Sequence, residues 1–206
     1  MTVGFVVLLF VVYQVFITDL SGDRAQEQLA DGLRDQWRTA GPDPVQPDFG
    51  NAFAFLHIPR LGHDYEQAVV EGTGEKQLEG APGHFEGTAM PGQVGNFAVA
   101  GHRVGYGSPF IDLDRLREHD AVVVETADSW HVYRVTRTEV TGPDDTATLA
   151  ALPGAPEAVP DRAYLTLVTC TPKYTDHQRL IVYAELEQTV SKTADPDGPS
   201  VLASDA

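Results

Sequence analysis

The only cysteine of the chain, Cys170, directly follows Tyr-Leu-Thr-Leu-Val-Thr, a run that favours a β-strand. Thr171 and Pro172 come next, so the thiol is expected where a strand runs out into a loop. A thiol attacks as its thiolate, which needs a neighbouring imidazole or guanidinium and some access to solvent. A single cysteine excludes an intramolecular disulfide and a cysteine-based zinc cluster. It leaves a buried apolar residue or a nucleophile.

A histidine and an arginine occupy comparable positions. His102 follows the apolar run Asn-Phe-Ala-Val-Ala-Gly, in which Gly101 lets the backbone turn so that the imidazole can leave the wall of a sheet. Arg179 opens the run Leu-Ile-Val-Tyr-Ala-Glu-Leu, nine residues after Cys170. If the strands that carry Cys170 and Arg179 pair, the loop between them brings the guanidinium back beside the thiol. The three side chains then meet at one end of a sheet.

Each of these residues also has a purely structural interpretation. Cys170 can be a buried apolar residue, His102 a loop histidine without a role and Arg179 a solvated surface charge. The chain has six other histidines, so histidine alone is weak evidence. No His-x-Glu-x-x-His or similar spacing occurs, and the glycine-rich stretches match no phosphate-binding pattern. The sequence therefore predicts neither a metal site nor a cofactor.

The rest of the sequence is typical of an all-β domain that positions such residues. Val, Ile, Tyr and Thr are frequent in short runs that are separated by Gly and Pro. Short helical turns are expected at residues 75–78 and 110–117. The predicted strands are Ala52–Ile58, Tyr65–Glu71, Asn96–Gly101, Ala121–Thr126, Trp130–Val140, Ala163–Thr169 and Leu180–Glu187. Strands without long helices must bury their edges, which indicates a closed or nearly closed β-barrel.

The N-terminal residues predict a membrane anchor. Residues 2–17 are apolar except for Thr2 and Gln14, and Leu20 extends the run. A helix of this length reaches roughly 24–28 Å, against a hydrocarbon core of about 30 Å. No basic residue precedes the run and no Ala-x-Ala site follows it, so an uncleaved transmembrane helix is favoured over a signal peptide. A buried core helix is the alternative.

The remaining boundaries follow from composition. Residues 21–48 predict a stalk, with a helix over Asp23–Arg38 and a linker, Gly41–Pro47, that holds three prolines. The barrel is expected from residue 49 to residue 190. Residues 191–206 are polar and small, which is typical of a disordered tail. Lys+Arg 14 against Asp+Glu 30 gives a formal net charge of −16, which argues against binding nucleic acid.

Two segments resemble the signatures of the sortase family. Thr-Leu-Val-Thr-Cys-Thr-Pro at 166–172, followed by Gln-Arg-Leu-Ile-Val at 178–182, is similar to the TLxTC strand end and the arginine that follows it. Residues 83–103, which end in Gly-His-Arg, resemble the segment that carries the catalytic histidine. The resemblance covers residues 52–188. The anchor, the linker and Cys-Thr-Pro-Lys-Tyr are most similar to class E.

The resemblance implies a cysteine transpeptidase with Cys170, His102 and Arg179 as catalytic residues. It also implies Tyr106 and Thr169 as substrate-binding residues, with Tyr106 reading the Ala position of a Leu-Ala-x-Thr-Gly motif. The implied substrates are secreted proteins with a C-terminal LAxTG- or LPxTG-type sorting signal, and the acceptor is an amine of a peptidoglycan precursor or a pilin. The implied location is the cell membrane of a Gram-positive bacterium, with the catalytic domain outside.

Two other functions remain open on the sequence. One is a Cys/His peptidase or an L,D-transpeptidase of the cell wall, although the latter usually has its histidine and cysteine close together, and here 68 positions separate them. The other is a non-catalytic barrel on a membrane stalk that binds a partner in the envelope. Alkylation of the thiol separates these, because a buried cysteine stays inert.

Overall fold

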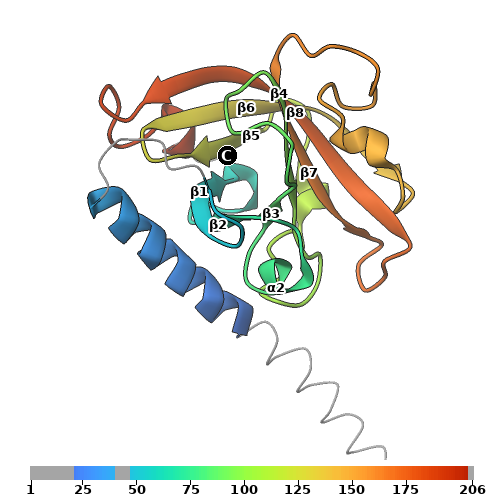
Figure 1. Ribbon diagram of the computed structural model, residues 1–206, viewed down its shortest axis with the longest axis horizontal. Helices are drawn as coiled ribbons and strands as arrows, with labels where there is room; N and C mark the ends of the chain where they lie inside the picture. The colour runs from blue at the N-terminus through green and yellow to red at the C-terminus, as the bar shows by residue number, and fades with distance from the viewer. Residues whose placement is uncertain (1–20, 40–46, 204–206) are drawn as a thin grey trace, which may run out of the picture.

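The computed structural model describes residues 21–39 and 47–203. In this part of the chain, eight strands close into a barrel in the order β1-β2-β3-β4-β7-β8-β6-β5 (Figure 1). The closed β-barrel predicted from the sequence is therefore confirmed. The strands are β1 (Ala52–His57), β2 (Glu66–Glu71), β3 (Gly83–His84), β4 (Gly95–Ala100), β5 (Ala121–Glu125), β6 (Ser129–Thr141), β7 (Ala163–Thr171) and β8 (Gln178–Ser191).

Short helices connect the strands. They are η1 (Pro59–Leu61), α2 (Glu75–Leu78), η2 (Leu113–Arg115), η3 (Thr146–Leu149) and η4 (Ser200–Leu202). The turn predicted at 75–78 is confirmed as α2, whereas the one predicted at 110–117 shrinks to η2. The predicted strands are all present, and β8 is longer than expected. Only two residues long, β3 was not predicted, because so short a strand has no alternation to detect.

Two strand pairings decide where the chemistry lies. β4 and β7 run parallel, with Ala100 opposite Val168, so both strands end on the same side of the barrel. β7 and β8 run antiparallel, with Cys170 directly opposite Arg179. The end of β4, the end of β7 and the start of β8 therefore meet at one mouth of the barrel.

The helix over residues 21–39 is present, but it is not a free stalk. In Figure 1 this helix, drawn in blue, lies alongside β1 and β2. Leu33 is buried against Phe55 and Ala68, which point outward from the barrel. The Trp37 ring meets the Phe55 ring edge-on at 5.4 Å. The apolar stripe of the helix therefore covers an apolar patch of the barrel. The domain boundary at residue 49 stays a prediction.

The segment after β8 also packs on the barrel, up to residue 203. Val201 and Leu202 lie against Trp130 in a cluster on the outer face of β5 and β6. The Trp130 indole N–H donates to the carbonyl of Asp195 at 3.2 Å. This corrects the predicted disordered tail. The few apolar residues in this polar segment bury a tryptophan, which its composition does not reveal.

Among the described residues, no helix has both the length and the apolar character needed to cross a membrane. The predicted anchor at residues 1–20 and the linker at residues 40–46 lie outside the described ranges. The anchor and the membrane location remain predictions.

Candidate active site

Cys170, His102 and Arg179 line one cavity of about 400 Å³ at the mouth of the barrel. Cys170 is partly exposed near the end of β7, and Arg179 lies opposite it on β8. His102 arrives from the neighbouring β4. The strand pairing predicted from the sequence is confirmed, and it brings a thiol, an imidazole and a guanidinium to one surface.

The backbone before His102 is held against β7. The amide of Gly101 donates to the carbonyl of Val168 at 3.1 Å, and the hydroxyl of Thr169 donates to the carbonyl of Gly101 at 2.7 Å. A side chain at position 101 would come within 2.6 Å of the Phe110 ring, so only glycine fits there. These contacts fix the point at which the chain leaves the sheet.

Thr169, which the resemblance implies as a substrate-binding residue, makes a contact within the barrel. It lines the cavity, but its side chain is buried and its hydroxyl is engaged by Gly101. In this geometry it supports the strand end that carries His102. Substrate contact by Thr169 stays a prediction.

The environment of His102 favours its neutral form. Burial lowers the pKa of the His102 imidazole below its usual value of 6.5, and the carboxylate of Glu79 offsets part of this lowering. A neutral imidazole at neutral pH can accept a proton from a thiol or an amine. The site can therefore act as a general base without first losing a proton.

Tyr106 lies beside His102. The two ring centroids are 5.0 Å apart and the rings are inclined by 31°. The backbone of Tyr106 is left-handed, with φ 55°, a conformation that side chains seldom adopt outside a tightly held turn. Tyr106 is not among the residues that line the cavity. Its contact with a substrate stays a prediction, whereas its contact with His102 is part of the structure.

Arg179 orders the loop that follows Cys170. One guanidinium nitrogen, Nη1, donates to the carbonyls of Asp176 at 2.7 Å and Gln178 at 3.2 Å. A guanidinium carries five N–H donors in a fixed fork, so one nitrogen can hold the loop while others face the cavity. The remaining donors can stabilise negative charge on an oxygen next to Cys170.

The rest of the cavity is largely apolar. Apolar side chains in its lining are Leu78 of α2, Phe85, Leu149 of η3 and Ile181 of β8. A groove of this kind suits an extended peptide with small or aliphatic side chains.

Comparison with known proteins agrees with this geometry. The family model described as Sortase domain matches residues 56–187. The chain belongs to the sortase family. Sortase SrtE1 of Streptomyces coelicolor is 36% identical over 95% of the chain and 58% of its own length, and Sortase SrtE2 of the same organism is 33% identical over 98% of the chain and 84% of its own. The chain thus spans little more than half of the SrtE1 relative.

The structural comparison leads to the same class. The crystal structure of sortase E1 from Streptomyces coelicolor, with a tripeptide in the active site, has a TM-score of 0.68 and 34% identity. It covers 76% of this chain and 99% of that chain. The similarity to class E, inferred above from the anchor, the linker and Cys-Thr-Pro-Lys-Tyr, is therefore confirmed by relatives that carry the class E name.

Three further contacts hold the loops of this sortase, and the sequence did not reveal them. The buried Arg103, next to His102, donates to the carbonyl of Ile111 at 2.7 Å and pairs with Asp114 at 2.8 Å. The Lys173 ammonium lies 3.0 Å from the Asp112 carboxylate, so the loop after Cys170 is tied to the loop after His102. No spacing rule predicts these contacts, because Arg103, Lys173 and Asp112 all lie on irregular backbone.

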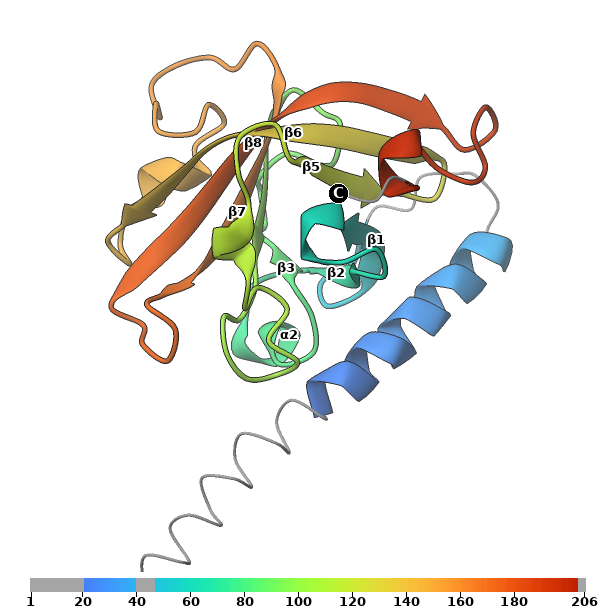
Figure 2. The ribbon, with the colours of Figure 1, turned by 180° about the vertical axis from the view of Figure 1, so that it is seen from behind.

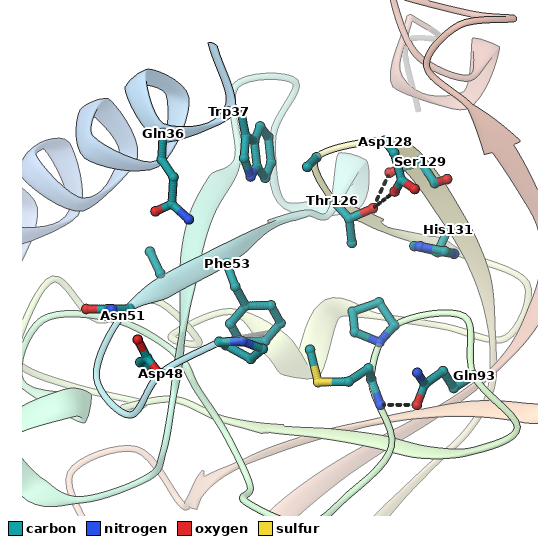
Figure 3. Close-up of a pocket in the computed structure, with 15 residues that line it drawn as sticks. Gln36, Trp37, Asp48, Asn51, Phe53, Gln93, Thr126, Asp128, Ser129 and His131 are labelled. Carbon is teal, nitrogen blue, oxygen red and sulfur yellow. Dashed lines mark hydrogen bonds between the residues drawn. The ribbon is translucent and has the colours of Figure 1, made fainter. Parts of the chain in front are cut away.

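A larger cavity of about 550 Å³ lies at the other end of the barrel (Figure 3). Trp37 of the N-terminal helix, Phe53 of β1 and His131 of β6 line it, together with Asp48 and Asp128. It contains none of the three candidate catalytic residues. Size therefore does not identify the reactive site of this sortase, whereas the thiol does.

One group could hold a metal ion by geometry, although the sequence predicted no metal site. One ligand atom each of His57, Glu66 and Glu125 lie within 4.8 Å of one another. Glu125 already contacts His57 at 2.8 Å and Lys192 at 2.7 Å, and Glu66 pairs with Arg34. Protein cations thus already balance these carboxylates.

Proposed function

We propose that this sortase is a transpeptidase that cleaves a C-terminal LAxTG- or LPxTG-type sorting motif between Thr and Gly. It then transfers the protein to an amine of the cell wall. The observation that carries this proposal is the pairing of Cys170 with Arg179 across β7 and β8, with His102 at the end of the adjacent strand. The three groups supply a nucleophile, an anion-binding cation and a proton carrier in one apolar groove.

In the first half of the reaction, neutral His102 takes the proton of the Cys170 thiol, and the resulting thiolate attacks the carbonyl carbon of the motif's threonine. The oxyanion of the tetrahedral intermediate accepts hydrogen bonds from the Arg179 guanidinium. The Thr–Gly C–N bond then breaks, and His102 donates a proton to the leaving glycine amine. A thioester between the threonine carbonyl and Cys170 remains.

In the second half, an acceptor amine attacks the thioester. Neutral His102 takes the proton that this amine releases, a role favoured by the lowered pKa of its buried imidazole. The C–S bond breaks, a new amide forms and the thiolate is regenerated. An apolar groove that limits water favours the amine over hydrolysis.

The expected substrates are secreted proteins with such a sorting signal, and the acceptor is an amine of a peptidoglycan precursor or a pilin. The tripeptide in the active site of the Streptomyces coelicolor sortase E1 structure supports a peptide ligand. We place the enzyme in the cell membrane as a single-pass protein, with residues 1–20 as anchor and the barrel outside. The apolar run of residues 2–17 supports that placement.

One incubation tests the function. The purified chain is mixed with Leu-Ala-x-Thr-Gly or Leu-Pro-x-Thr-Gly peptide and a glycine nucleophile, and products are identified by mass. The expected product joins the motif up to Thr with the added glycine, and a covalent adduct on Cys170 accumulates without nucleophile. A chain that forms neither product nor adduct with either peptide would refute the proposal.

A further inference from the structure

The start of the N-terminal helix touches the loop that carries Tyr106. A Cβ atom on Gly22 would lie 2.2 Å from the carbonyl carbon of Tyr106 and 2.4 Å from the amide nitrogen of Gly107. A Cβ on Gly107 would in turn lie 3.2 Å from the Asp23 carboxylate. Figure 2 shows the first turn of this helix close to α2 and to the loop that follows β4. Helix and loop therefore meet backbone to backbone, which is possible only because Gly22 has no side chain.

Directed hydrogen bonds fix the helix in this place. The Gln26 amide donates to the carbonyls of Ala68 and Gly80, both at 3.1 Å, and accepts from the amide of Ala68 at 2.8 Å. Gln26 thus forms hydrogen bonds with the backbone N–H and carbonyl of Ala68 in β2. The short β3 pairs only with Val70 and Glu71 of that strand. Further along the same helix, Leu33 is buried against Phe55. The helix has a defined position relative to the barrel.

The loop itself is anchored on both sides of its tip. Arg103 and the hydroxyl of Tyr65, which donates to the carbonyl of Pro109 at 2.8 Å, hold the two sides. The tip has four consecutive left-handed residues, with φ 83° at Gly105, 55° at Tyr106, 78° at Gly107 and 48° at Ser108. Left-handed backbone at Tyr106 and Ser108 costs energy, so surrounding contacts must maintain it.

We propose that the N-terminal helix is part of the catalytic unit. It positions the tip of the loop after β4, and through the ring contact between Tyr106 and His102 it positions the imidazole. Gly22 and Gln26 are then positioning residues, and the segment next to the predicted anchor is coupled to the reactive thiol. The inference rests on the proposed roles of His102 and Tyr106 but goes beyond them, since the helix lies outside the residues matched by the sortase family model.

The chain provides a matched pair of variants for the test. Gly22→Ala introduces a methyl group into the backbone of the loop, whereas Gly32→Ala, in the same helix, has nothing within 4 Å. Both exchange glycine for alanine within a helix, and each removes a helix-weakening residue. Activity is measured on the full chain with the sorting peptide and normalised to the folded fraction of each variant, read from its urea denaturation curve, so that unfolded protein does not count.

We expect Gly32→Ala to keep kcat and KM within about twofold of wild type. Gly22→Ala should lower kcat at least tenfold, roughly, with a smaller effect on KM, because misplacing a proton carrier by about 1 Å slows the chemical step far more than it weakens binding. Equal kcat for the two variants at equal folded content would overturn the inference. An inactive wild type would instead count against the proposed function.

A second measurement does not depend on activity. Gln26→Leu removes the hydrogen bonds to Ala68 and Gly80 without touching the loop. Hydrogen exchange of residues 101–110 should then become faster, while the amides of β7 keep their wild-type protection. Unchanged exchange in the loop would show that the helix does not hold it, and uniform acceleration across β7 would reduce Gln26 to a general stabilising role.

Discussion

The proposed mechanism gives each of the three residues at the barrel mouth a separate chemical task, and single substitutions should separate activity from folding. Cys170→Ala removes the nucleophile and should abolish transpeptidation. His102→Ala and Arg179→Ala should lower kcat/KM by a factor of about one hundred or more, as is usual for loss of a proton carrier or an oxyanion donor. Thermal melts should stay close to wild type, since all three side chains are partly exposed. Wild-type turnover in Cys170→Ala would end the thioester mechanism.

Tyr106→Phe isolates one hydroxyl, because phenylalanine keeps the ring contact with His102. A phenol at this place can bond to the backbone N–H that alanine has and proline lacks. The preference for Leu-Ala-x-Thr-Gly over Leu-Pro-x-Thr-Gly should therefore fall about three- to tenfold, the value of one net hydrogen bond. The ratio of kcat/KM for the two peptides measures this. Tyr174→Phe, on the exposed loop after Cys170, is the control, and the same ratio in all three proteins would remove Tyr106 from the specificity site.

At this scale the sequence reveals which side chains meet at the candidate site better than it reveals the contacts around them. Cys170, His102 and Arg179 could be predicted because each stands where an apolar run begins or ends, and such runs form strands. The bond from Thr169 to Gly101 could not, because it joins positions 68 apart and depends on the register of β4 with β7. The same holds for Glu79, which affects the pKa of His102 from an unrelated segment.

At the scale of elements, the ion pair between Lys173 and Asp112 joins the two loops that border the groove. The hydrogen bond from Lys173 also holds the pKa of the Asp112 carboxyl below its usual value. An exposed pair of this kind adds little to global stability, about 1 kcal/mol at most. Its effect should instead appear in the geometry of the groove.

Lys173→Ala should leave the melting temperature almost unchanged and lower kcat/KM severalfold, as an order-of-magnitude expectation for loosening one groove wall. Added salt should lower the kcat/KM of the wild type toward that of the variant, because salt screens the ion pair. The kcat/KM of the variant, which lacks the pair, should change less. Arg115→Ala is the matched control. Arg115 pairs with the same Asp112 at 3.6 Å, but within one loop. Equal losses in both variants would contradict a role in joining the loops.

The strands could be predicted from the sequence, whereas the segments that pack on the outer face of the barrel could not. Val122 and Val124 face the barrel interior, whereas Val123 between them is buried under the C-terminal segment. β1 shows the same pattern, with Leu56 inside and Phe55 under the N-terminal helix. An unbroken apolar run in an antiparallel strand indicates burial on both faces. That signal was present in both strands, but it does not say which segment provides the cover.

For the whole molecule, the N-terminal helix should contribute to folding as well as to the site. Leu33→Ala should cost about 2–5 kcal/mol of the free energy of unfolding, as for other buried leucines. Deletion of residues 1–48 should lower the free energy of unfolding by at least as much. The sequence alone placed the start of the barrel at residue 49, outside this helix. Urea denaturation measures both. Val159→Ala, at an 89% exposed position, should stay within about 0.5 kcal/mol of wild type, and a deletion as stable as wild type would show that the helix is dispensable.

The pH dependence of stability also belongs to the whole molecule. Burial lowers the pKa of the His131 imidazole, and Asp128 offsets only part of this lowering. The unfolded chain therefore binds more protons than the folded one between the folded-state pKa and about 6.5, and stability falls as pH drops through that window. His102 acts in the same direction. The lowered pKa of Asp112 acts only at lower pH, because its contribution is lost as pH falls through its folded-state value.

His131→Gln should therefore reduce the slope of the free energy of unfolding against pH between pH 7.5 and pH 5, and not only lower or raise the whole curve. The imidazole nitrogen Nδ1 lies 3.1 Å from the Thr189 hydroxyl, and a glutamine amide can replace that contact without taking up a proton. The measurement is the free energy of unfolding from urea titrations at several pH values across this range. His177→Gln, on the exposed loop after Cys170, should keep the wild-type slope. If His131→Gln also keeps the wild-type slope, proton uptake by the buried His131 is not what destabilises the fold in mild acid.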